Sequence, residues 1–218
     1  MKEKNNKFNK LIIALIVTIL VAGMIVIFTV GFNKSIIYQK GTKIEVKIDQ
    51  GYQLEDIKEI AKETFPSRDM YLQKIEKLDQ IVSIKVDHYT EEELENFKTK
   101  IVEKYGMNKD ELQVEEVESP TTRISTLALP YLMPVILVTA LTFIYIGIKN
   151  IKNKKIGKVM ITLLLALVST IGIYFSVIAI ARIPISTYTM PIALVIYVAT
   201  LLITVINLNK EKEIEEEQ

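Results

Sequence analysis

The stretch that decides the fold is LIIALIVTILVAGMIVIFTVGF at residues 11–32, in which no side chain is charged. A helix needs about 20 apolar residues to cross the hydrocarbon core of a bilayer, and this stretch is long enough. Lysines precede it, as they do in a secretory signal, but the apolar region of a signal is about 7–15 residues long and leads into a small-residue cleavage site. Here Ala22-Gly23-Met24 is followed by four further apolar residues. The sequence therefore predicts an uncleaved membrane anchor.

Three more uncharged apolar stretches occupy the second half of the chain, at residues 127–148, 159–181 and 189–208. The loop 149–158 carries five basic side chains and no acidic one: Lys149, Lys152, Lys154, Lys155 and Lys158. Cytoplasmic loops of membrane proteins carry an excess of Lys and Arg, so these lysines are the predicted determinants of topology. A lipid headgroup site is the alternative use of such a cluster.

The lysine bias predicts where each remaining segment lies. Residues 1–10 carry four lysines and are placed in the cytoplasm together with the loop 149–158. Four crossings then put residues 33–126 and the short loop 182–188 outside the membrane, and the tail 209–218 inside. With a Lys-, Ile- and Asn-rich composition, this predicts a multi-pass protein of a bacterial plasma membrane with both termini in the cytoplasm.

Residues 33–126 contain twenty acidic and fifteen basic side chains, and their pattern predicts a small outer α+β domain. Polar and apolar residues alternate over 43–48, as they do in a half-buried strand. Apolar residues then recur at helical spacing from Leu54 onward, and Pro66 marks the end of that helix.

The rest of the outer segment adds a second helix and three more strands. Strands are predicted at residues 71–78, 81–87 and 112–117. Thr90 and Glu93 have the spacing of a capping box, and the helix that they begin ends at Gly106, a residue suited to a left-handed cap. The order β-α-β-β-α-β is the ferredoxin-like split βαβ arrangement. We therefore expect an α+β membrane protein with four transmembrane helices and a ferredoxin-like domain between the first and the second.

Few side chains are available for catalysis or metal binding. The chain has no cysteine and one histidine, His88, which has no partner at ligand spacing. The acidic run at 91–95 lacks the alternating ligands of a calcium loop, and acids there complement the dipole of a helix start. No nucleotide-binding glycine motif and no nucleophile–base constellation occurs. We expect no enzyme activity, no catalytic, cofactor or metal site, and no binding of nucleic acid, since the net charge is only +1.

The segment GFNKSIIYQKGTKIEV at residues 31–46 resembles a segment that follows the first span of SecF-like proteins, G-L-N-F-G-I-D-F-T-G-G-T-L-I-E-V. The two match without a gap at eight positions, and Tyr38 stands for a Phe. The matched positions include the candidate structural motif residues Gly31, Asn33, Gly41, Thr42 and Glu45. In this motif and in its layout, the chain is similar to the SecD/SecF protein-export membrane proteins of the resistance-nodulation-division superfamily.

The chain also departs from that family. Its members have six spans, whereas four are predicted here. The His-Asp pair of the family's third span corresponds to Leu165 and Ala166, and the membrane Asp of the fourth corresponds to Leu201. A proton relay needs ionisable groups that face the interior of the bundle. The resemblance therefore implies a shortened, divergent SecF-like protein without a relay of its own.

The function implied by the resemblance is that of an accessory of protein export, acting by binding and conformational coupling. The implied partners are the lipid bilayer, a SecD-like or translocase membrane protein, and unfolded polypeptide. The alternative is a membrane-anchored sensor or scaffold protein whose outer domain binds a ligand or partner protein, because ferredoxin-like domains support many functions.

Overall fold

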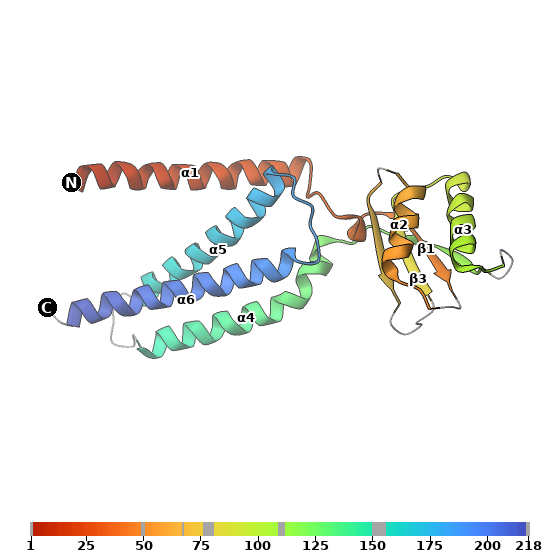
Figure 1. The fold of residues 1–218 in the computed structure, drawn as a ribbon. Helices are drawn as coiled ribbons and strands as arrows, with labels where there is room; N and C mark the ends of the chain where they lie inside the picture. The colour runs from red at the N-terminus through yellow and green to blue at the C-terminus, as the bar shows by residue number, and fades with distance from the viewer. Residues whose placement is uncertain are drawn as a thin grey trace. The chain divides into compact units, whose positions relative to one another are not determined.

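The computed structural model describes residues 2–48, 51–66, 68–75, 81–108, 112–149 and 156–216. The chain divides into two compact units, Met1–Asn33 with Ile124–Gln218, and Lys34–Arg123. The first unit holds the long helices and the second holds the sheet (Figure 1).

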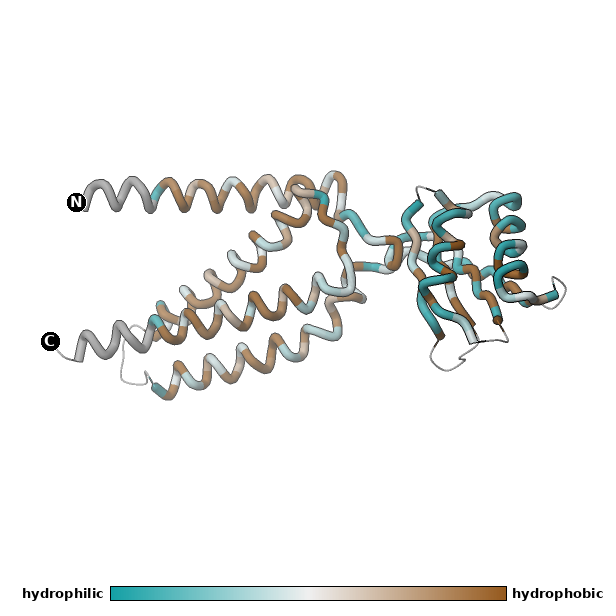
Figure 2. Tube along the Cα trace, viewed as in Figure 1, coloured by the Kyte–Doolittle hydropathy of each residue, from teal (hydrophilic) through white to brown (hydrophobic). Residues whose placement is uncertain are grey.

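The first unit is built from four long helices, α1 (Lys2–Thr29), α4 (Ile124–Lys149), α5 (Ile156–Ile180) and α6 (Thr189–Glu216). By length and composition, each contains a segment able to cross a membrane: Lys10–Thr29, Ile124–Lys149, Ile156–Ile180 and Thr189–Asn207. Figure 2 shows hydrophobic residues along these segments. These are the features of a membrane protein.

The first helix ends earlier than the predicted span. α1 stops at Thr29 rather than at Phe32 because the next two N–H groups both donate to the carbonyl of Val26. Gly31 adopts a positive φ of 74°, which glycine enters without steric cost. The left-handed glycine therefore ends the helix inside the apolar stretch.

All four helices also extend beyond the predicted spans. α1 begins at residue 2 instead of 11, α4 at 124 instead of 127 and α5 at 156 instead of 159, and α6 continues to residue 216 instead of 208. The tail that extends α6 is rich in Lys and Glu, which are good helix formers, and contains no Gly or Pro. Hydropathy marks where a helix enters a membrane, whereas backbone hydrogen bonding continues past that point.

Within the first unit, α5 packs against both α1 and α6, and α4 packs mainly against α6. The backbones of α1 and α5 approach closely at two glycines. A Cβ on Gly23 would overlap the side chain of Ser176, and a Cβ on Gly172 would lie 2.8 Å from Cδ2 of Leu20. Without a hydrophobic driving force between helices in lipid, such close packing of small residues is a main source of helix association.

Gly23→Leu is therefore expected to separate α1 from α5 and to lower the thermal stability of the detergent-solubilised protein. Overpacking alone costs about 1–3 kcal/mol, and here there is no room for even a methyl group. The matched control is Gly147→Leu on α4, where a Cβ would meet only Cε of Met160, at 3.8 Å. Equal melting temperatures for the two variants would contradict this packing.

The second unit is a four-stranded sheet with two helices. After a short 3-10 helix, η1 (Ile36–Tyr38), its elements are β1 (Gly41–Lys47), α2 (Leu54–Thr64), β2 (Met70–Lys74), β3 (Ile81–Val86), α3 (Glu91–Tyr105) and β4 (Val114–Ser119). The strands lie in the order β2-β3-β1-β4, and every neighbouring pair is antiparallel. The mixed α+β class is confirmed.

All four strands have other bounds than those predicted. The strand predicted at 43–48 is β1, Gly41–Lys47, and the strand predicted at 81–87 is β3, Ile81–Val86. The strand predicted at 71–78 is β2, Met70–Lys74, and residues 76–78 of that prediction lie outside the described residues. The strand predicted at 112–117 is β4, at Val114–Ser119. It extends further because it pairs with β1 as far as Gly41, which faces Ser119.

One face of the sheet and both helices share a single apolar core. Ile44 and Val46 of β1 are fully buried, as are Phe97 of α3 and Phe65 at the end of α2. The two phenyl rings lie 5.7 Å apart between centroids, within the range of favourable aromatic pairs. Alternation in the strands and helical spacing in α2 and α3 place these side chains on facing surfaces.

The predicted ends of α3 are confirmed. Thr90 and Glu93 form the capping box, each side chain accepting a hydrogen bond from the other residue's backbone N–H, and Gly106 closes the helix with a φ of 62°. The bond from the Thr90 N–H holds the pKa of Glu93 below its usual value. A carboxylate whose pKa is lower in the folded state than in the unfolded state stabilises the fold at pH values above the unfolded-state pKa. This stabilisation is lost as the pH falls through the folded-state pKa.

Candidate functional site

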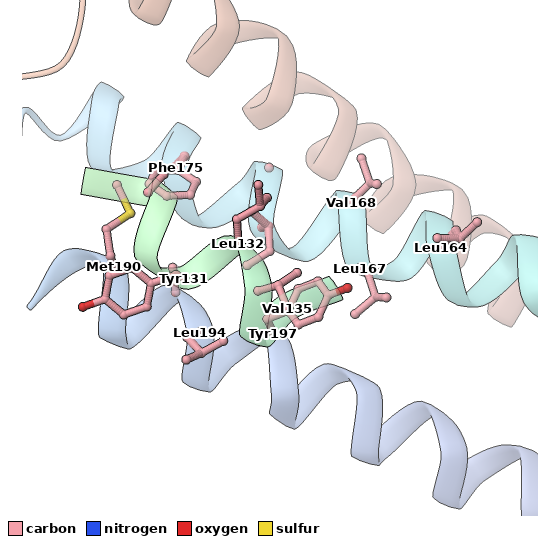
Figure 3. Close-up of a pocket in the computed structure, with 14 residues that line it drawn as sticks. Tyr131, Leu132, Val135, Leu164, Leu167, Val168, Phe175, Met190, Leu194 and Tyr197 are labelled. Carbon is pink, nitrogen blue, oxygen red and sulfur yellow. The ribbon is translucent and has the colours of Figure 1, made fainter. Parts of the chain in front are cut away.

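An open cavity of the helix unit lies between α4, α5 and α6 and has a volume of about 510 Å³. Figure 3 shows side chains from all three helices converging on it, among them Leu132 and Val135 of α4, Phe175 of α5, and Leu194 of α6. Among the described residues that line it, Tyr131 and Tyr197 are the ones with a polar side chain. The cavity is therefore suited to an apolar occupant.

One of the two tyrosines is already engaged by the protein. The Tyr197 hydroxyl lies 2.5 Å from Oγ1 of Thr139 on α4. Because the Thr139 hydroxyl donates to the carbonyl of Val135, at 2.6 Å, Tyr197 is the donor in the bond between the two side chains. This bond joins α6 to α4 at the wall of the cavity.

Two prolines weaken the part of α4 beside the cavity. Pro130 and Pro134 have no N–H, so neither can donate to the carbonyl four residues before it. Sharp bends in helices are found mostly at prolines, and Figure 1 shows α4 bending near its start. The bend lies in the same turns that contribute Tyr131 and Val135 to the cavity.

The position aligned with the family's membrane Asp is part of an apolar core. Leu201 is 2% exposed and packs with Ile146 of α4 and with Leu163 and Leu167 of α5. Leu165, aligned with one member of the family's His-Asp pair, is exposed on the surface of α5. In the sequence, the spans at residues 159–181 and 189–207 contain no Asp, Glu, His, Lys or Arg.

Two of the motif residues, Gly31 and Asn33, hold the end of α1 to the loop between α5 and α6. The Asn33 side chain donates to the carbonyl of Arg182 at 3.0 Å, and its own carbonyl accepts from the N–H of Ile185 at 2.9 Å. The Arg182 guanidinium donates to the carbonyl of Gly31 at 2.6 Å. Sequence reasoning gave Arg182 and Ile185 no role in holding this loop. In the structure Ile185 is fully buried.

The other three motif residues lie in β1 of the second unit. A Cβ on Gly41 would overlap the carbonyl oxygen of Val86 on β3, so the close pairing of these strands requires glycine. Thr42 also pairs with Val86, and Glu45 lies between Ser83 of β3 and Glu115 of β4. These residues shape the sheet.

A buried lysine that sequence reasoning missed holds η1 to the sheet. Lys85 of β3 is 3% exposed, and its ammonium donates to the carbonyls of Ile37 and Gln39 at 2.9 and 2.8 Å. Burial lowers the pKa of Lys85, and the nearby Lys43 lowers it further. The sequence did not signal this burial, because the alternation of β3 puts Lys85 on the face opposite the apolar core.

The topology lysines are only partly described. Lys149 ends α4, with its ammonium 5.9 Å from the ring centroid of Tyr145, and Lys158 lies in the first turn of α5. Lys152, Lys154 and Lys155 lie outside the described residues. Among the residues that the structure describes, no three His, Cys, Asp or Glu side chains are grouped as metal ligands.

Comparison with known proteins finds a similarity among solved structures. No family model and no curated protein matches the chain. Among solved structures, the chain is similar to the crystal structure of SecDF in its super-membrane-facing form, with a TM-score of 0.54 and 14% identity. The similarity covers 86% of this chain and 25% of the other, so the chain spans about a quarter of that structure's length. At this identity the similarity is one of fold.

Proposed function

We propose that this protein is a SecF-like accessory membrane protein of protein export. The observation that carries the proposal is the similarity of fold to SecDF, which covers 86% of the chain. The matches at residues 31–46 support the same relationship, because Gly31, Asn33 and Gly41 each have a structural role that depends on that residue type.

The outer domain is best classified as ferredoxin-like. Its elements follow the order β-α-β-β-α-β, and an antiparallel sheet in which β3 and β1 are central agrees with two interleaved split βαβ units. The two interior strands carry the buried core, while β2 and β4 form the edges. Contact with unfolded polypeptide or with a partner's outer domain is the role that we assign to this domain.

The protein acts by binding and conformational coupling, and any proton dependence of export comes from a partner chain. The apolar packing around Leu201 supports this, because a relay needs ionisable groups that face the interior of the bundle. A SecD-like or translocase membrane protein is the partner that we expect, beside the lipid bilayer.

The test is purification of the tagged full chain from its native membrane in mild detergent, followed by mass spectrometry. We expect recovery of a SecD-like or translocase component, which an unrelated four-span protein with the same tag does not retain. Recovery of no export component would contradict the proposal and favour the sensor or scaffold alternative.

The proposed topology is testable by thiol labelling, because the chain has no cysteine of its own. A cysteine introduced at Ser67 is expected to react with an impermeant reagent in intact cells, and one at Asn153 only after permeabilisation. Both positions lie outside the described residues, in segments that the lysine bias places on opposite sides of the membrane. Equal labelling of both in intact cells would overturn the four-span topology.

A further inference from the structure

The sheet of the outer domain ends on a strand whose second side is open. β4 pairs with β1, and in the strand order β2-β3-β1-β4 no other strand of the described chain pairs with it. All six residues of β4 are in continuous register with β1, without a bulge. A regular edge strand presents a row of unpaired N–H and C=O groups, which is a template for one more strand.

The register identifies the backbone groups of β4 that face the open side. The N–H of Lys47 donates to the carbonyl of Gln113 at 3.1 Å, so residue 113 is bonded to β1. Hydrogen-bonded and non-hydrogen-bonded pairs alternate along an antiparallel ladder. Residues 115, 117 and 119 therefore bond to β1, whereas the N–H and C=O groups of Val114, Glu116 and Glu118 point to the open edge.

The side chains along this edge are acidic. β4 has the sequence VEEVES, in which Glu115, Glu116 and Glu118 are exposed and no residue is basic. Lys43 and Lys47 belong to β1, one strand further from the edge. Like charges on directly opposite residues destabilise a sheet, so these glutamates repel a second copy of β4 and favour a strand that carries lysine or arginine.

The surroundings of Glu115 also favour a cation. Glu45 of β1 lies directly opposite Glu115, a like-charge pairing that destabilises the sheet. Beside them is an open cavity of about 310 Å³, whose lining includes Lys47 and Gln113. Lys47 offsets only one of the two carboxylates. A basic side chain placed beside Glu115 by an added strand therefore reduces the remaining repulsion.

The other edge strand, β2, differs in access and in charge. Its sequence is MYLQK, with no acidic residue, and its first three residues are only half-exposed. Both α2 and η1 contact it. β4 is therefore the edge better suited to a basic strand.

We propose that β4 binds an extended basic segment of an unfolded polypeptide, which joins the sheet as a fifth strand. This inference rests on the proposed function and names the kind of polypeptide that the outer domain contacts. In strand addition, main-chain hydrogen bonds give affinity and alternate side chains give specificity. An antiparallel segment complements the edge when basic residues lie opposite the three glutamates and apolar residues lie opposite Val114 and Val117. The matching segment reads Lys-Val-Lys-Lys-Val.

The first arm of the test separates strand addition from attraction by charge alone. The full chain in nonionic detergent is titrated with a fluorescent Lys-Val-Lys-Lys-Val peptide, and binding is followed by anisotropy. N-methylation of the third peptide residue, whose N–H faces Glu116, is expected to weaken binding about tenfold or more, because it removes a main-chain donor. N-methylation of the fourth, whose N–H faces away from β4, leaves binding unchanged. No binding to the parent chain, or equal weakening by the two methyl groups, would overturn the proposal.

The second arm reverses the charges of the edge. The double variant Glu115→Lys, Glu118→Lys is expected to bind the lysine peptide about tenfold or more weakly and to bind Glu-Val-Lys-Glu-Val instead. Glu116 stays in place because the Tyr89 hydroxyl donates to it. Misfolding cannot produce a gain of binding, so this reversal of preference is specific to the edge.

The matched control for this arm is Glu59→Lys, Glu103→Lys. It makes the same change of charge at exposed positions of α2 and α3 in the same unit, and both peptides are expected to bind it as they bind the parent. Equal effects of the two double variants would contradict a site on β4.

A last variant identifies the occupant of the edge. Glu118→Pro removes an N–H that points to the open side and no bond to β1, so the sheet is expected to tolerate it. A parent chain that is a dimer, and that Glu118→Pro makes a monomer, would show a second copy on β4 and overturn the proposal. Recovery of an export component without peptide binding contradicts this inference alone, whereas peptide binding without such recovery contradicts the proposed function alone.

Discussion

Leu201→Asp is expected to abolish accumulation of the folded protein in the membrane. The side chain is 2% exposed in the cluster with Ile146, Leu163 and Leu167, so the change removes buried packing worth about 2–5 kcal/mol. It also places an acid at membrane depth, which costs roughly 2.5–3.5 kcal/mol on insertion scales. Together, the lost packing and the insertion cost approach the total stability of a typical domain, about 5–15 kcal/mol. Size-exclusion profiles of the detergent-extracted chain measure the effect.

Two control variants separate the cost of lost packing from the cost of inserting an acid into the membrane. Leu201→Met conserves volume and is expected to cost less than about 1.5 kcal/mol. Leu202→Asp introduces the same acid one residue further along, where the side chain is 59% exposed, so it carries the insertion cost without the loss of packing. A Leu201→Asp chain as stable as the parent would mean that polar groups or water reach this cluster, and a proton relay would then have to be reconsidered.

Phe97→Ala is expected to remove about 3–5 kcal/mol from the stability of the outer domain. Phe97 is fully buried and contacts Phe65, so its ring links α3 to the end of α2. The fragment Lys34–Arg123 has a core of its own, and we expect it to fold alone as a monomer with mixed helix and strand. Urea denaturation followed by circular dichroism measures the loss.

The matched control on the same fragment is Val117→Ala. Val117 is 38% exposed on the edge strand β4, and its truncation is expected to change stability by less than about 1 kcal/mol. A random-coil spectrum for the parent fragment would contradict the independent domain, and equal losses for the two variants would contradict the core centred on Phe97.

The sequence determined the features that depend on residues close together along the chain. Four uncharged stretches of sufficient length define four helices able to cross a membrane, and the alternation in β1 and β3 defines strands. The Thr90–Glu93 capping box and the Gly106 cap fix the ends of α3 because their hydrogen bonds span only a few residues.

The tertiary structure alone decided which distant residues meet. Arg182 and Asn33 are 149 residues apart, and no local pattern signals that the end of α1 is held to the loop before α6. Lys85 is charged, so its burial against the carbonyls of Ile37 and Gln39 cannot be inferred from its residue type, since lysine is rarely buried. The cavity beside Tyr131 likewise depends on how α4, α5 and α6 diverge. Helix packing sets that space, whereas hydropathy reports only that each helix is apolar.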